Sequence, residues 1–170
     1  MAIIVMKKLI KKIVLLLAAT ILATVLWFAG LQQTYARVLS FTTNTVLSAA
    51  GRTSGIQVEK QDDAHVFQIY TIIENQQAQY PQKYSILLLP SVMMFAWIAF
   101  TPFFRKPKEA IRSSFILFLV FLFTQVVFLL LLTAYYSSPI ASFFYDVMMD
   151  GFYIIALGII IIDNLIDPVF

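Results

Sequence analysis

The sequence predicts an all-α membrane protein with four transmembrane helices and a small extracytoplasmic α+β loop, which holds an amphipathic helix and a β-hairpin. Of its 170 residues, 61% are hydrophobic and only 12% are charged, unlike the proportions of a soluble domain. Most of the basic residues form two clusters beside long apolar runs, as in the cytoplasmic segments of multi-pass proteins. The clusters are Lys7, Lys8, Lys11 and Lys12, and Arg105, Lys106, Lys108 and Arg112.

Charge and cysteine content exclude several classes of protein. The formal net charge is +3, but the basic residues flank apolar runs instead of covering a polar face, so we expect contact with membrane lipid and no nucleic acid. The chain has no cysteine, which excludes disulfides, thiolate nucleophiles and cysteine-ligated metals. The loop outside the membrane must therefore be held together by packing alone.

Four stretches are long enough to cross about 30 Å of hydrocarbon, which takes about 20 apolar residues. The first is expected to be an uncleaved anchor, because Trp27 and Phe28 stand where a signal peptidase needs small side chains. Pro90 and Pro102 predict a kink or an end in the second. The fourth is long enough only if it begins near Pro139. The crossings are residues 13–30, 85–104, 113–136 and 140–162.

This count of crossings predicts the topology. Residues 1–12 and 105–112 are expected in the cytoplasm, because basic residues beside crossings stay on that side, and four crossings place the acidic tail 163–170 there as well. Both termini are then cytoplasmic, and the loop of residues 31–84 is extracytoplasmic.

The loop divides into a helical part and an extended part. Residues 31–50 have apolar side chains at helical spacing and are followed by Gly51, a residue that often ends a helix. The next segments are expected to be strands at 56–59 and 65–73, a turn at 61–63, and a polar linker at 75–83. Because an isolated hairpin is marginally stable, this one is expected to lean on the helix or on a partner.

Three short motifs stand in a characteristic order. Leu26-Trp27-Phe28 closes the first crossing, Leu89-Pro90 lies near the outer end of the second, and Phe100-Thr101-Pro102 lies at its inner end. Together with the outer helix and strand pair, this order resembles small membrane proteins associated with exosortase systems. The resemblance implies a protein of the bacterial inner membrane that assists a membrane-embedded protein-sorting enzyme. It supplies no catalytic motif.

The residues suited to catalysis do not form a catalytic set. His65 is the only histidine, and one histidine makes neither a triad nor a metal site without converging groups. An aspartyl dyad of Asp146 and Asp163 is excluded, because seventeen residues of helix separate them by about 25 Å. We therefore expect no enzyme activity and no cofactor.

Four polar residues are the candidates for a functional contact. Asp146 and Asp150 lie on one face of the fourth crossing, where carboxylates need protein, water or a cation nearby. They either sit at the headgroup level or pair with Arg37 or with a partner's basic residue. Gln125, in the third crossing, is expected to bond to a neighbouring helix.

Two functions remain open at this stage. The favoured one is a non-catalytic accessory or scaffold protein that binds a membrane enzyme or its substrate through the loop and helices. The alternative is a small oligomeric transporter or channel subunit that uses Asp146, Asp150 and Gln125.

Overall fold

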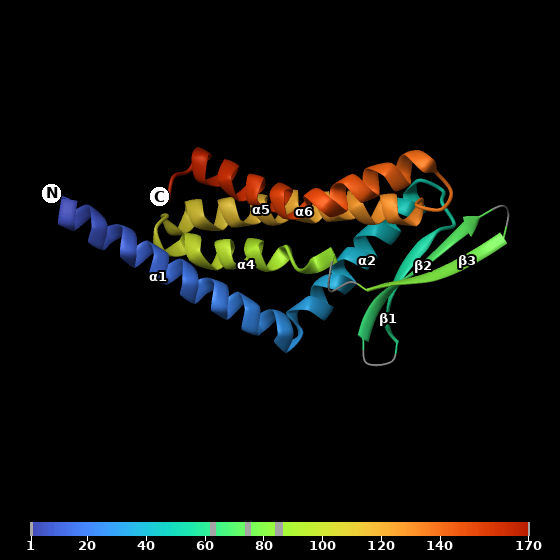
Figure 1. Ribbon diagram of the computed structural model, residues 1–170, viewed down its shortest axis with the longest axis horizontal. Helices are drawn as coiled ribbons and strands as arrows, with labels where there is room; N and C mark the ends of the chain where they lie inside the picture. The colour runs from blue at the N-terminus through green and yellow to red at the C-terminus, as the bar shows by residue number, and fades with distance from the viewer. Residues whose placement is uncertain (1, 62–63, 74–75, 84–86, 170) are drawn as a thin grey trace. The chain divides into compact units, whose positions relative to one another are not determined.

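The computed structural model describes residues 2–61, 64–73, 76–83 and 87–169, and within these ranges the chain is mostly helical with one small sheet (Figure 1). The longer helices are α1 (Ala2–Leu26), α2 (Gln32–Ala49), α4 (Ser91–Phe100), α5 (Pro107–Thr133) and α6 (Pro139–Ile166). The short helical segments are η1 (Trp27–Leu31) and η2 (Thr101–Phe103), and the strands are β1 (Gly55–Gln61), β2 (Ala64–Ile73) and β3 (Gln76–Lys83).

Three helical stretches are long and apolar enough to cross a membrane: Met6–Ala49, Pro107–Thr133 and Pro139–Ile166. They contain the first and fourth expected crossings and all but the last three residues of the third, and α6 begins at Pro139 as the sequence predicts. The second expected crossing contains the shorter apolar helix Ser91–Phe103. Pro90 lies just before the first turn of α4, and Pro102 lies in the 3₁₀ segment η2 that follows α4. Both prolines are at the ends of the helix, because proline lacks the N–H that a helix interior requires.

Glycines mark both ends of α2. At Gly30 the backbone has φ of 125°, which interrupts the helical path between α1 and α2 and which side-chain-bearing residues rarely adopt. After α2, Gly51 has φ of 66°, and the N–H of Arg52 donates to the carbonyl oxygen of Leu47 at 2.9 Å. The left-handed backbone at Gly51 lets the N–H groups of Gly51 and Arg52 bond to the last carbonyl oxygens of α2. The predicted helix and its end at Gly51 are therefore confirmed.

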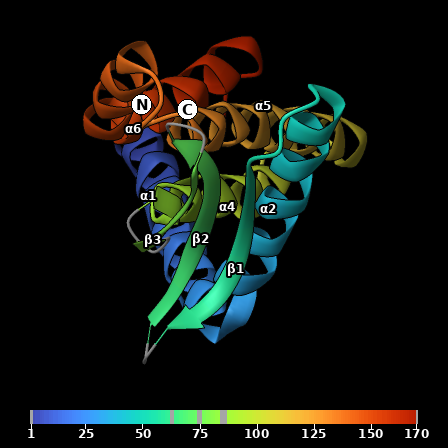
Figure 2. The same cartoon turned by 90° about the vertical axis from the view of Figure 1, so that its right-hand side faces the viewer.

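The extended part of the loop is a three-stranded antiparallel sheet in the order β1-β2-β3 (Figure 2). The two predicted strands are present as β1 and β2, whereas the expected turn residues Asp62 and Asp63 lie outside the described residues. The linker prediction for residues 75–83 was wrong, because Gln76–Lys83 pairs with β2 along its length as β3. Polar side chains and Pro81 suggested a linker, but proline is compatible with an edge strand whose outward positions need no partner.

The described chain forms two compact units, each with its own core. Unit 1 comprises Met1–Ala29, Pro90–Phe121 and Tyr153–Phe170, and unit 2 comprises Gly30–Leu89 and Leu122–Phe152. In unit 1, α1 packs against α4, and the rings of Trp27 and Phe95 lie 5.9 Å apart. In unit 2, Phe128 of α5 stacks on Tyr145 of α6 at 4.6 Å. Polar contacts also join segments within each unit.

Candidate functional site

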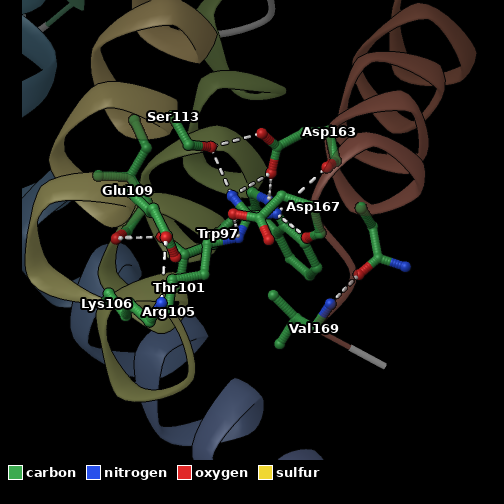
Figure 3. A network of polar contacts seen from close by, with 11 residues as sticks. Trp97, Thr101, Arg105, Lys106, Glu109, Ser113, Asp163, Asp167 and Val169 are labelled. Carbon is green, nitrogen blue, oxygen red and sulfur yellow. Dashed lines mark hydrogen bonds and ion pairs between the residues drawn. The ribbon is translucent and has the colours of Figure 1, made fainter.

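A buried ionic cluster lies in unit 1, around Arg105 between η2 and α5 (Figure 3). Arg105 is only 7% exposed. Its Nη1 lies 2.9 Å from Oδ2 of Asp163, and its Nε lies 3.0 Å from Oδ2 of Asp167. One guanidinium therefore joins the chain just before α5 to two carboxylates at and just beyond the end of α6.

Further donors complete the shell around the Asp163 carboxylate. The Trp97 indole Nε1 donates to Oδ2 at 2.7 Å, and the Ser113 hydroxyl donates to Oδ1 at 2.5 Å. Arg105 also donates to the Ser113 hydroxyl and to the carbonyl oxygens of Asp163 and Asp167. These three donors come from α4, from α5 and from the segment before α5, so the Asp163 carboxylate joins these parts of unit 1 to α6.

The C-terminal segment is attached to α1 in the same unit. The Lys12 ammonium donates to the carbonyl oxygen of Val169 and lies 5.7 Å from the centre of the Phe104 ring. The Asn164 side chain accepts from the N–H of Val169 at 2.8 Å. Residues from both basic clusters and from the C-terminal segment thus meet within unit 1.

This cluster was missed by the sequence reasoning. Arg105 was assigned to topology alone, Asp163 was examined only as half of a catalytic dyad, and Ser113 and Trp97 were not considered. Arg105 and Asp163 are 58 residues apart, so no local pattern connects them. The available signal was weaker: a basic residue and a carboxylate at crossings expected to end on the same side of the membrane.

In unit 2 the candidates Asp146 and Asp150 lie on α6, and both are exposed, as is Arg37 on α2. Among the described residues, no ion pair joins Arg37 to either carboxylate. Instead, Oδ1 of Asp146 accepts a long hydrogen bond of 3.4 Å from the Tyr135 hydroxyl.

The other two polar candidates occupy ordinary structural positions. Gln125 on α5 is 2% exposed, and its expected bond to a neighbouring helix stays a prediction. His65 lies on β2, half-buried and directly opposite Lys60 of β1. The structure does not bring His65 together with the four candidate residues through any contact described here.

Unit 2 fixes β1 to α2 through the backbone of one buried residue, Ile56. The Asn44 side chain accepts from the N–H of Ile56 and donates to its carbonyl oxygen, both at 2.8 Å. The Ser40 hydroxyl donates to that same carbonyl at 2.6 Å. One amide side chain therefore takes the place of a neighbouring strand, because it supplies one donor and one acceptor at the same spacing.

The other strands of unit 2 are fixed to the end of α5. The Thr71 hydroxyl of β2 donates to the carbonyl oxygen of Thr133 at 3.0 Å, and the Tyr80 hydroxyl of β3 donates to that of Leu132. The last carbonyls of a helix have no partner inside the helix. Two hydroxyls of the sheet supply that partner, so the sheet caps α5 and is held by it.

No protein-family model matches this chain, and no curated protein and no solved structure gives a significant match to it. The class of protein therefore rests on its own features. It is a mostly helical chain with three helices long and apolar enough to span a membrane, and with a small sheet fixed to helices in one of its two units.

Proposed function

We propose that this is a multi-pass protein of the bacterial cytoplasmic membrane with four crossings, and that it acts as a non-catalytic accessory or scaffold protein. Its sheet and α2 would form an extracytoplasmic docking platform for a membrane-protein partner. The observation that carries this proposal is the attachment of all three strands to helices by side-chain hydrogen bonds. A platform held in this way loses little conformational entropy when it binds a partner.

Exposed apolar side chains support the membrane assignment. Large hydrophobic residues are exposed along α1, α5 and α6, among them Ile21, Phe115 and Ile154. Such extensive apolar surface is unfavourable in water, whereas lipid would cover it without penalty. The exposed face of the sheet is different in character, with Gln57, Glu59 and Gln79 among its exposed residues.

Contacts inside unit 1 support the second of the four proposed crossings, which contains α4 and η2. Trp27 near the end of α1 contacts Phe95 of α4, and Lys12 near the start of α1 lies over Phe104, after η2. The α4–η2 segment thus runs antiparallel to α1 for the length between these contacts. If α1 crosses the hydrocarbon, its neighbour reaches across a similar depth, and residues of both basic clusters share one end as the topology requires.

The partner expected from the motifs is an exosortase-like enzyme or its substrate. The three protein donors on Asp163 support a structural role for this carboxylate in such a companion protein. The transporter alternative is favoured by one observation, the exposure of Asp146 and Asp150 on the apolar helix α6.

Site-specific photo-crosslinking in native membranes would test the scaffold proposal. A photoreactive residue at Gln79, exposed on the sheet, is expected to give a protein adduct of one defined mass, identifiable by mass spectrometry. The matched control is Ile154, which is 75% exposed on α6 and is expected to give lipid adducts. Lipid adducts alone at both positions would contradict the proposal.

Reconstituted liposomes would separate the two functions. A scaffold is expected to leave ion and solute flux at the level of empty liposomes, with and without the double change Asp146→Asn and Asp150→Asn. Flux that needs both carboxylates would instead establish the transporter alternative.

A further inference from the structure

The two hydrogen bonds between the Asn44 side chain and the backbone of Ile56 form a clamp. This clamp shows which backbone groups of β1 point out of the sheet. Because the N–H and C=O of Ile56 both bond to Asn44 of α2, they point away from β2. Backbone direction alternates along an antiparallel strand, and the β1–β2 register is unbroken from Gly55 to Gln61. The N–H and C=O groups of Val58 and Lys60 therefore also point outward, and within the described residues no hydrogen bond satisfies them.

The opposite edge of the sheet is protected. Ile69 of β2 is the partner of Ile56, so its backbone groups face β3 and bond to Tyr80 across an unbroken register. Gln79 and Pro81 then point outward from β3. Proline has no N–H to offer to an added strand, and it is a common device for blocking an edge. On β1, by contrast, none of the outward positions that follow Ile56 is a proline.

A hollow of about 350 Å³ lies beside this open edge, between α2 and β1. Its walls include Arg37 and Phe41 of α2 and Val58 of β1, and of the residues that the structure describes only Arg37 lines it with a charge. The side chains of Arg37 and Phe41 are exposed. At one end the hollow is bounded by Asn44, where the clamp occupies the backbone of Ile56.

We propose that this hollow is a strand-docking site, in which an extended acidic segment of a partner protein pairs with β1 as a fourth strand. The segment would bond to the outward groups of Val58 and Lys60, and its acidic side chain would face Arg37. Main-chain pairing at an open edge gives affinity in this mode of recognition, and side-chain pockets give specificity. The proposal rests on the scaffold function and names the chemistry of its partner.

The charges near this edge favour an acidic segment. Arg37 lines the hollow and Lys60 is exposed further along β1. The one acidic residue of β1, Glu59, accepts a hydrogen bond from Tyr70, and among the described residues no acidic side chain lines the hollow. Arg37 also offers a planar group that binds a carboxylate through two hydrogen bonds. The exposed Phe41 supplies an apolar contact for the neighbouring side chain of the segment.

The test uses the full chain in nanodiscs of neutral phosphatidylcholine and a fluorescent peptide, acetyl-Thr-Val-Thr-Asp-Thr-Val-Thr-amide, measured by fluorescence anisotropy. We expect saturable binding, about tenfold weaker for the peptide with asparagine in place of aspartate, as for loss of a charged hydrogen bond. The peptide with proline at both valine positions is expected not to bind. Absence of binding by the aspartate peptide at about 1 mM, a very weak affinity, would overturn the proposal.

Two variants locate the site. Val58→Pro removes one outward N–H without removing a bond within the sheet, and Arg37→Gln removes the charge; each is expected to weaken binding about three- to tenfold. Arg52→Gln is the matched control, because Arg52 is exposed in the same unit but does not line the hollow. If Val58→Pro does not fold, the test rests on Arg37→Gln. This variant is expected to bind the aspartate peptide and the asparagine peptide equally well.

Three outcomes would overturn the proposal. One is equal loss with Arg52→Gln, which indicates general charge attraction. Another is unchanged peptide binding in Arg37→Gln together with a loss of binding to anionic vesicles, which assigns Arg37 to lipid headgroups. The third is an unchanged crosslink from Gln79 in both site variants with no peptide binding by the unmodified chain. That last result would leave the scaffold function standing and remove strand docking alone.

Discussion

The two units of this protein are held together by different chemistry. In unit 1 a buried guanidinium joins two carboxylates, and Arg105 lies 58 residues from Asp163. In unit 2 neutral side chains bond to backbone groups, and Asn44 lies only 12 residues from Ile56. Removing one member of a buried ionic cluster leaves a charge unpaired, whereas removing a neutral group leaves only a dipole unpaired. Replacing one residue of the ionic cluster should therefore lower the free energy of unfolding more than replacing one hydrogen-bonding side chain of unit 2.

The largest effect is expected from Arg105→Gln, which leaves Asp163 and Asp167 without their shared cation. The free energy of unfolding should fall by about 3–5 kcal/mol, because breaking a buried pair strands its partner. Unfolding of the detergent-solubilised protein by heat or by SDS would measure this change. The control is Lys106→Gln, which removes an adjacent, exposed charge and should alter stability by less than about 0.5 kcal/mol. Equal stability of the two variants would contradict the comparison.

A smaller effect is expected from Asn44→Ala in unit 2. The buried N–H of Ile56 loses its acceptor, while Ser40 still bonds to the carbonyl, so the loss should be about 1–3 kcal/mol. Hydrogen exchange at the Ile56 amide should accelerate before exchange in α6 does. Thr45→Ala, at an exposed position on the same helix, is the control. If exchange at Ile56 is as slow in Asn44→Ala as in Thr45→Ala, the clamp does not hold the strand.

Gly30→Ala tests the conformation at the junction of α1 and α2. A φ of 125° is strained for any residue with a side chain, so we expect a loss of about 1–2 kcal/mol. Gly158→Ala in α6 is the opposite case, because no atom lies within 4 Å of the added methyl group and alanine favours helix. Thermal unfolding should rank Gly158→Ala above the unmodified chain and Gly30→Ala below it. The reverse order would show that the helix is continuous at Gly30.

The smallest effect is expected from pH at the contact between the sheet and α5. Burial, followed by the neighbouring tyrosines, raises the pKa of Tyr80 above its ordinary value of 10.0. Above pH 10 the unfolded chain releases the Tyr80 proton while the folded chain keeps it. The contribution of Tyr80 to the free energy of unfolding is therefore fully present below pH 10 and is lost as the pH rises further. The apparent unfolding temperature should drop more steeply above pH 10 in the unmodified chain than in Tyr80→Phe. Tyr153→Phe, which changes an exposed tyrosine of α6, should keep the full drop.

Local patterns predicted the elements well but not their ends or partners. The helix before Gly51 and the strands β1 and β2 follow from apolar spacing and from turn residues within a few positions. The segment that forms β3 has no apolar alternation, and Pro81 argued against a strand. Only its pairing with β2, and the bond from Tyr80 to Leu132, make it one.

The candidate sites show the same division. Arg37, Asp146 and Asp150 were chosen because charges are conspicuous in an apolar chain, and all three are exposed. The buried Arg105 and the half-buried Asp163 were assigned to the ends of crossings, where ionised residues are common. A sequence shows that a charge is present, but burial and pairing depend on segments that are distant along the chain.

Composition and periodicity by themselves determined that this is a helical chain with long apolar helices and a small extended segment, because apolar content and side-chain spacing are local properties. The tertiary structure alone decided that three strands pair into one sheet, that Asn44 occupies the backbone of Ile56, and that Arg105 joins two carboxylates. The bond from Asn44 to Ile56 joins residues 12 positions apart, and Arg105 contacts residues 58 and 62 positions away. Their formation depends on which faces of distant segments meet, and no local pattern in the chain encodes that choice.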